Sequence, residues 1–264
     1  VDRDELTKLV NIIKNEEQNY DEKEKRAIKE GKEFYEKCQR SEKFEGLASP
    51  DERVKMKSGH IDQDSLVSGV CEAIIDTFPE DCVAYEFKKN TRKKLAGLNK
   101  RKVVKQRIRK LNDHTQLYLN TRKLGFTLRD REWKLLSTWV KEENKIWIIY
   151  TDTSQLDKEF PTSSSNVLAS ATTVWCFEEL DKGYKGGLPK CKASFASRVD
   201  VKGNIPKAIM NTLSSSFASN MIKMRKKFDK SREIDAFNRL QIIKKMKKIK
   251  SNSAKTFTEE FKDV

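Results

Sequence analysis

Imidazole and thiol groups, which serve as catalytic bases, nucleophiles and metal ligands, are few and scattered in this sequence. The only two histidines, His60 and His114, lie in charged segments typical of turns, and we expect both to be exposed loop residues. A Ser or Cys nucleophile usually needs an imidazole base. Gly-rich phosphate loops, a GxSxG elbow and an HExxH helix are absent from the sequence. We therefore predict that the chain is not an enzyme.

The cysteines favour packing rather than metal binding or disulfide formation. Zinc sites need closely spaced thiolate and imidazole ligands, and the sequence has no CxxC pair. We expect reduced, mostly buried thiols, as in a cytosolic protein, with neither a metal nor a cofactor. The five residues are Cys38, Cys71, Cys82, Cys176 and Cys191.

A late helix offers a different chemistry, the burial of apolar surface. After Ile205-Pro206-Lys207, apolar residues recur every three or four positions, which places them on one helix face. This face can be ordinary core, or it can line a pocket for a flexible apolar ligand, because methionine adapts its shape. Spacing alone leaves both interpretations open. The residues are Met210, Leu213, Phe217, Met221, Met224 and Phe228.

The charge balance predicts an anionic partner. The 264 residues include 55 Lys and Arg against 40 Asp and Glu, a net charge of 55 − 40 = +15. Two basic runs could dock on an anionic membrane or could simply be solvated surface. Nucleic acid is disfavoured, because no aromatic residues interleave with the basic ones. The candidate membrane patch comprises Lys93, Lys94, Lys100, Arg101, Lys102, Lys244, Lys245, Lys247 and Lys248.

Hydrophobic periodicity predicts the elements that must position these residues. A sparse apolar stripe over residues 3–39 favours a single, largely solvated helix. A helix begins at Pro79, and another spans about 205–228 before a basic helical tail that we expect to fray. Between them lie several strands, so the fold class is α+β. The expected strands cover 53–57, 66–76, 115–121, 132–140, 145–151, 167–180 and 189–201.

The sequence shows no membrane-spanning or secretory segment. No window approaches about 18 consecutive apolar residues, and the first residues, Val1-Asp2-Arg3-Asp4-Glu5, are unlike a signal peptide. The initiator Met is missing, so we expect a piece of a longer chain. We expect a cytoplasmic protein that is peripheral on membranes.

Three stretches together resemble the START domain, the lipid-transfer module related to the steroidogenic acute regulatory protein. The resemblance covers about 185 residues, from Phe44 to Phe228, and its last stretch is the most specific. The stretches are Phe44 to Asp81, containing Ala73-Ile74-Ile75-Asp76-Thr77-Phe78-Pro79-Glu80-Asp81; Leu128-Arg129-Asp130-Arg131-Glu132-Trp133; and Val199-Asp200-Val201-Lys202-Gly203-Asn204-Ile205-Pro206-Lys207 to Asn211.

The resemblance implies a helix-grip fold, in which a curved antiparallel β-sheet wraps around a long C-terminal helix and encloses a lipid tunnel. It implies that the late helix and a loop at about 152–166 act as a gate. Leu156, Phe160, Asn204 and Ile205 would contact the membrane. The residues expected to bind lipid are Asn120, Trp139, Ile148, Tyr150, Ser170, Thr172, Val174, Ser194, Met210, Leu213, Ser214, Phe217 and Met221.

The chain departs from the family in its polar anchor. Many members pair an Arg with an acid inside the tunnel, but 167–171 contains no Arg and 117–121 contains no acid. We therefore expect no buried ion pair, with neutral hydrogen bonds from Asn120, Ser170, Thr172 and Ser194 in its place. Because basic flanks also suit anionic bilayers, a glycerophospholipid is the favoured cargo and a sterol is an alternative.

The predicted organisation has three parts. Residues 1–39 form a charged helical extension, 40–228 the START-like lipid-binding domain, and 229–264 a basic helical extension. We expect a monomer that carries one lipid between membranes. A lipid-sensing or tethering module of a larger protein, without transfer activity, is the alternative. Whether the two terminal extensions pack on the domain is left open by the sequence.

Overall fold

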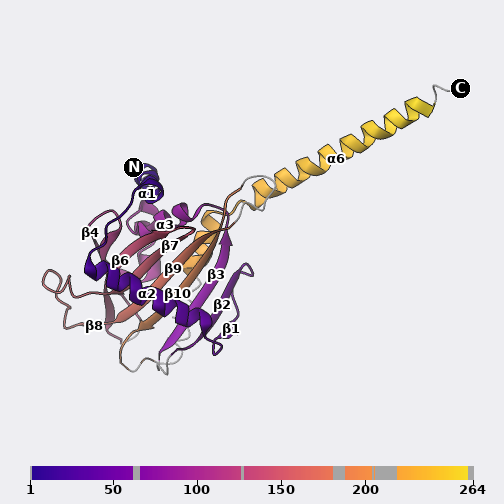
Figure 1. Cartoon of the computed structure of the whole chain (residues 1–264). Coiled ribbons are helices and arrows are strands. Elements are labelled where there is room, and N and C mark those ends of the chain that lie inside the picture. Colours follow the sequence, from indigo (N-terminus) through magenta and orange to yellow (C-terminus); the bar gives the residue numbers. More distant parts are fainter. Residues whose placement is uncertain are drawn as a thin grey trace.

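A computed structural model describes residues 2–61, 66–125, 128–180, 188–203, 205 and 219–260, with side chains as far as Ile249. Its centre is one sheet in the order β1-β2-β3-β10-β9-β7-β6-β5-β4, antiparallel throughout (Figure 1). A short strand, β8, pairs in parallel with β6. The strands are β1 Glu45–Leu47, β2 Val54–His60, β3 Val67–Ile75, β4 Val103–Lys110, β5 Thr115–Arg122, β6 Asp130–Glu142, β7 Lys145–Asp152, β8 Asn166–Leu168, β9 Ser170–Leu180 and β10 Lys190–Asp200.

Helices cover both faces of this sheet. We call the face that carries α3 (Pro79–Phe87) and the helical residues 219–227 the inner face. The opposite, outer face is covered by α2 (Glu22–Arg40), which crosses the strands in Figure 1. Successive strand residues alternate between faces, so Ile148 packs with α3 and Ile149 packs under α2. The mixed helix and antiparallel-sheet architecture confirms the predicted α+β class, and the sheet is open rather than a closed barrel.

The N-terminal segment forms two helices rather than the single predicted one. Residues 16–21 separate α1 (Asp2–Asn15) from α2. The break has a local cause, a capping box in which Asp21 accepts from the Glu24 backbone and Glu24 accepts from the Asp21 backbone, both at 2.8 Å.

Both N-terminal helices pack on the sheet domain. Ile12 and Ile13 of α1 join the inner-face core beside α3, while Phe34 and Cys38 of α2 are buried on the outer face. The packing left open by the sequence is therefore present in the structure.

Most predicted strands are confirmed, with three differences. The short strand β1 was not among the predicted strands. The strand β4 escaped prediction because its inward Val and Ile positions sit in a dense run of Lys and Arg. The apolar segment 167–180 is two strands, β8 and β9, separated at Ala169. The helix beginning at Pro79 is confirmed as α3. After it come a short helix α4 (Arg92–Ala96) and the 3-10 turn η1 (Asn99–Arg101).

The C-terminal helix α6 (Ser231–Glu260) projects away from the rest of the molecule (Figure 1). It continues over 30 residues instead of fraying as expected. Asp229 caps its start by accepting hydrogen bonds from the Ser231 backbone and hydroxyl, at 2.9 and 2.5 Å. None of the described helices combines the length and hydrophobicity that crossing a membrane requires.

Candidate functional site

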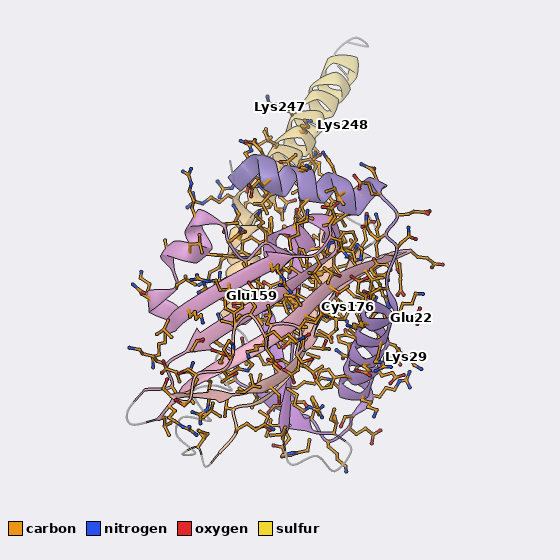
Figure 2. All side chains as sticks on the ribbon, turned by 90° about the vertical axis from the view of Figure 1, so that its left-hand side faces the viewer. Glu22, Lys29, Glu159, Cys176, Lys247 and Lys248 are labelled. Carbon is orange, nitrogen blue, oxygen red and sulfur yellow. The ribbon has the colours of Figure 1, made fainter. Side chains whose placement is uncertain are left out.

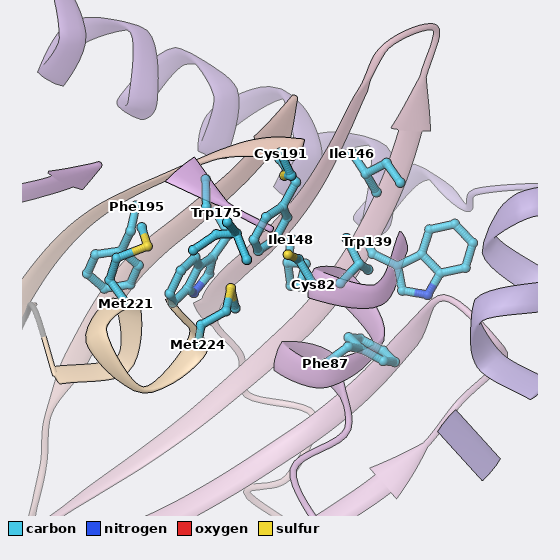
Figure 3. Packing of buried hydrophobic residues seen from close by; sticks show 14 of the residues in the cluster. Cys82, Phe87, Trp139, Ile146, Ile148, Trp175, Cys191, Phe195, Met221 and Met224 are labelled. Carbon is cyan, nitrogen blue, oxygen red and sulfur yellow. The ribbon is translucent and has the colours of Figure 1, made fainter. Parts of the chain in front are cut away.

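Aromatic and sulfur-containing side chains form the apolar part of the inner face. Trp175 of β9 stacks on Phe177 at 5.6 Å and packs against Phe195 of β10 at 4.7 Å, between ring centroids. Met221 and Met224 approach these rings from the helical residues 219–227 (Figure 3), and both are fully buried. The sheet and the late helix thus meet through a surface of flexible thioethers and flat rings.

The helix α3 brings a second set of groups to the same face. Pro79 suits the first turn, and Thr77 donates to Asp81 at 2.7 Å, which fixes the entry into the helix. Its Cys82, Val83 and Phe87 pack into the inner-face core. Cys82 lies near Cys191 of β10 in Figure 3. The apolar face of α3 therefore determines where the polar residues of its last turn must lie.

Glu86 of that last turn belongs to a buried polar network, which we define as Glu86, Lys89, Tyr118, Asn120 and Tyr150. Glu86 is 6% exposed, pairs with the Lys89 ammonium, and accepts from the Tyr150 hydroxyl at 3.5 Å. The Lys89 ammonium also lies 4.9 Å from the centre of the Tyr150 ring. Asn120 donates to the Tyr118 hydroxyl at 2.7 Å. Charged and neutral polar groups are thus enclosed at one end of the inner face.

Burial and neighbouring charge set the protonation states in this network. Burial alone would lower the pKa of Lys89, but the Glu86 carboxylate raises it above the ordinary lysine value. Burial raises the pKa of the Tyr150 hydroxyl, which therefore stays protonated. The network consequently presents an ion pair and a hydroxyl donor at neutral pH.

A second lysine, Lys94, lies against the end of α3. Its ammonium donates to the Lys88 carbonyl at 2.9 Å and to the Tyr85 carbonyl, and it lies 4.5 Å from the Tyr85 ring centre. Burial, reinforced by Lys89 and Arg101, lowers the pKa of Lys94 to about 7. The carbonyl acceptors oppose this shift, because they favour the ammonium form.

The structure brings five of the predicted lipid-binding residues to the inner face and places others elsewhere. Asn120, Trp139, Ile148, Tyr150 and Met221 are buried there. Met210, Leu213, Ser214 and Phe217 lie outside the described residues.

The outer-face residues require a correction. Val174 packs beneath α2, and Ser194 donates to Glu72 at 3.4 Å on that same face. Thr172 of β9 lies opposite Arg198 of β10, whose guanidinium lies over the Phe34 ring of α2. Ser170 lies two residues before Thr172 on the same strand and therefore points to the same face. The sequence predicted these strands correctly, but the residues of β9 and β10 that it predicted to face inward were the wrong ones. We therefore leave Ser170, Thr172, Val174 and Ser194 out of the site.

The structure also places the predicted gate residues in different surroundings from those expected. Leu156 is 2% exposed and packs against Leu117 and Leu119 in an outer-face cluster, so its predicted membrane contact is wrong in this conformation. Phe160 packs on that cluster and lies 5.4 Å from the Lys105 ammonium. Ile205 is half-buried, and Asn204 lies outside the described residues.

The first basic run is only partly a surface patch. Lys93, Lys100 and Lys102 are exposed, but Lys94 is engaged as described above and Arg101 donates to the Lys94 carbonyl at 2.6 Å. The second run is exposed along α6. Its residues are Lys244, Lys245, Lys247 and Lys248, of which the last two are labelled in Figure 2.

The sequence missed the ionic half of the network. We expected no buried ion pair, yet Glu86 and Lys89 form one from α3 and the segment after it rather than from two strands. A signal was present, because a carboxylate lies next to Phe87 and one turn beyond Cys82 and Val83 on the buried side of α3.

Neither histidine belongs to this site. The expectation of an exposed His114 is wrong: it is 4% exposed and contacts Gln18 at 2.8 Å and Glu24 at 3.3 Å. All five cysteines are buried, as predicted. In the described ranges, no three His, Cys, Asp or Glu side chains gather as metal ligands would.

Comparisons with known proteins agree with this architecture. Human STARD10 shares 16% identity at a TM-score of 0.56, with 82% of each chain covered. Human StAR-related lipid transfer protein 5 shares 14% at 0.57, covering 77% of this chain and 98% of its own. A fragment of a Xanthomonas axonopodis StAR-related lipid transfer protein shares 14% at 0.54, covering 71% and 99%. These identities show a common fold.

Sequence comparison supplies the family. A search of curated proteins found no match. The START domain model, in contrast, matches residues 99–233, just over half of the chain. That stretch runs from η1 through β4–β10 to the start of α6. It contains Tyr118, Asn120 and Tyr150 of the network and the aromatic and thioether surface, and begins after the Glu86–Lys89 pair. The chain therefore belongs to the START domain family.

Proposed function

We propose that this chain binds one lipid between the inner face of its sheet and its late helix, and transfers it between membranes. The observation that carries the proposal is the amphipathic character of the inner face. An aromatic and thioether surface occupies one part, and the buried polar network occupies another. A lipid has the same two parts, an apolar chain and a polar head.

The apolar part suits acyl chains. Transferring apolar surface out of water contributes about 25 cal/mol per Å², so a carrier must enclose the chains almost completely. Met221 and Met224 adapt to a flexible ligand, while Trp175 and Phe195 supply broad flat contacts. Opening would require these methionines to leave the rings that they now cover.

The polar part suits a charged head group. A buried ion pair seldom stabilises a fold more than well-packed apolar side chains would. The pair Glu86–Lys89 is therefore better explained by recognition than by stability. Tyr118 and Asn120 add neutral donors and acceptors beside it.

A glycerophospholipid is the favoured cargo. Glu86, Lys89 and Arg101 all lie near enough to act electrostatically on Lys94, so two permanent cations and a partly protonated lysine accompany one carboxylate. Lys223 of the late helix is similarly influenced by Arg101 and Arg122. Such a surplus of positive charge complements a phosphodiester, whereas a sterol hydroxyl would need only Tyr118 or Asn120.

Docking completes the proposed cycle. The exposed Lys93, Lys100 and Lys102 would contribute about 1 kcal/mol each near an anionic leaflet. We propose a monomeric, peripheral membrane protein that exchanges its lipid without altering it.

The test is to identify the cargo directly. The full chain is incubated with vesicles containing phospholipids, cholesterol and ceramide, reisolated, and analysed by native mass spectrometry. We expect one chemically unchanged phospholipid per chain. The Glu86→Gln/Lys89→Gln variant should lose it, whereas Ser194→Ala on the outer face should retain it. A folded wild type that carries no lipid would overturn the proposal of lipid binding. A folded wild type that carries only cholesterol would overturn the assignment of a phospholipid cargo.

A further inference from the structure

The segment of α6 from Leu240 to Lys250 exposes an unusual amount of apolar surface. Its five aliphatic side chains are between 47% and 65% exposed. They are Leu240, Ile242, Ile243, Met246 and Ile249. Isolated exposed apolar residues are ordinary, but a contiguous set marks an interaction surface.

These side chains share one side of the helix. Leu240, Ile243, Met246 and Ile249 follow one another at intervals of three, and Ile242 precedes Met246 by four. At 3.6 residues per turn, all five fall within about half of the circumference. We call this half the aliphatic face of α6. It lies on the part of the chain that projects away from the sheet domain (Figure 1).

Lysines occupy the remainder of the same segment. Lys244, Lys245 and Lys248 lie opposite the aliphatic face. Helical spacing places Lys247 near the border of this face and Lys250 within it, at the end of the segment, where a long side chain can reach outward to the head groups. Figure 2 shows Lys247 and Lys248 on the projecting helix. Residues 236–258 contain no Asp or Glu at all. The segment therefore combines an aliphatic face with a strong net positive charge.

We infer that α6 is an interfacial membrane helix that inserts its aliphatic face into an anionic lipid bilayer. Aliphatic side chains on one face and lysines on the other are the composition that such helices require. The bilayer accepts the aliphatic groups below the head groups, while anionic lipids neutralise the lysines. The statement that this contact serves lipid loading rests on the proposed function. The binding of α6 to a bilayer is a separate property and does not depend on it.

A second copy of this chain fits the surface less well. A coiled coil needs a continuous apolar seam and opposite charges beside it. The seam through Ala236, Leu240 and Ile243 meets Lys247 and Lys250 on its next turns. Two such helices would bring lysines together with no carboxylate between 236 and 258 to pair with them.

The experiment measures binding of the full chain to sedimenting vesicles. One set is pure phosphatidylcholine and the other contains phosphatidylserine as well. We expect binding to the anionic vesicles, weakened by salt, and a loss of about tenfold or more for Ile243→Gln/Met246→Gln. The matched control, Asn238→Ala/Gln241→Ala, alters the opposite side without changing the charge and should bind as wild type. Replacing Lys244, Lys245 and Lys248 by Gln should cost about fivefold per residue.

Each other outcome contradicts the inference. Equal binding by the two double variants would show that the aliphatic face does not insert. A wild type that ignores anionic vesicles but forms a dimer in sedimentation analysis, abolished by Ile243→Gln/Met246→Gln, would assign the face to a second copy. Circular dichroism verifies that the variants keep their helix. Vesicle binding without any bound lipid would leave this inference intact and overturn the proposed function instead.

Discussion

The guanidinium of Arg225 donates from Nε to the Asp51 carboxylate at 2.9 Å and ties the late helix to the turn before β2. Asp229, at the junction with α6, accepts from the same guanidinium at 3.4 Å and lies 3.5 Å from Arg53. Arg225 is 5% exposed. These four charged groups thus hold the C-terminal end of helical residues 219–227, which carry Met221 and Met224. If this helix moves, we expect this end to stay in place.

Removing Arg225 should weaken this anchor and the whole domain. Arg225→Met leaves Asp51 without its main partner, and losing hydrogen bonds to a charged group costs about 1.5–3 kcal/mol. We expect the free energy of unfolding in urea to fall by that amount. Lys226→Met, which removes an exposed charge on the next residue, is the control and should change little. Equal stability of the two variants would contradict the anchor.

The anchor also predicts a loss of stability in acid. Hydrogen bonds from Ser231 lower the pKa of Asp229 from 3.8 to about 2, and hydrogen bonds from Arg225 lower that of Asp51 against the opposing effect of burial. A carboxyl group with a lowered folded pKa stabilises the fold above its unfolded value and loses this effect as the pH falls. The unfolding free energy should therefore decline between about pH 4 and pH 2. In Arg225→Met the decline should be shallower; identical slopes would refute the assignment.

Close packing of α2 on the sheet predicts a sensitive glycine. A Cβ added at Gly31 would lie 2.6 Å from Cγ2 and 2.9 Å from Cγ1 of the buried Ile149. Overpacking of this kind costs about 1–3 kcal/mol, partly offset by the better helix propensity of Ala. Gly31→Ala should lower the melting temperature, while Gly46→Ala, with open space around it, should not. An unchanged Gly31→Ala would mean that α2 does not pack here.

The Glu86–Lys89 pair should show strong coupling. Breaking a buried pair from one side costs about 3–5 kcal/mol, because the other charge remains buried. We expect this loss in Lys89→Gln and recovery of most of it in Glu86→Gln/Lys89→Gln, since no buried charge remains. A double-mutant cycle from urea unfolding measures the coupling. Additive effects would show that the two charges do not interact.

Local sequence patterns predicted the α+β class, and the resemblance to the START family supplied the helix-grip architecture. Alternation predicted β5 and β6, an apolar run after a charged turn predicted β7, and Pro79 marked the start of α3. Ile148 and Tyr150 lie two residues apart on β7, so they share the inner face, where both were expected. The N-terminal helices were harder to predict, because the contacts that bury Ile13 and Phe34 come from elements distant in the sequence.

The errors at the site have physical causes. On β9 and β10 both faces are covered, so apolar and small polar residues occur on each and the parity is ambiguous. That ambiguity misplaced Val174 and Ser194. Lys89 was hidden in a long run of lysines and arginines, where nothing local separates a buried ammonium from exposed ones. The fold decides that difference by placing Glu86 and Tyr150 beside it.

The most direct test of lipid transport is transfer between vesicles. Donor vesicles carry labelled phosphatidylcholine, phosphatidylethanolamine or cholesterol, and the label reaching acceptor vesicles is followed with and without the full chain. We expect the chain to accelerate the movement of a phospholipid. Glu86→Gln/Lys89→Gln should reduce the rate about tenfold or more, through lost charge-assisted contacts, while Ser194→Ala should not. A folded wild type that moves no lipid, or a double variant as fast as wild type, would contradict this expectation.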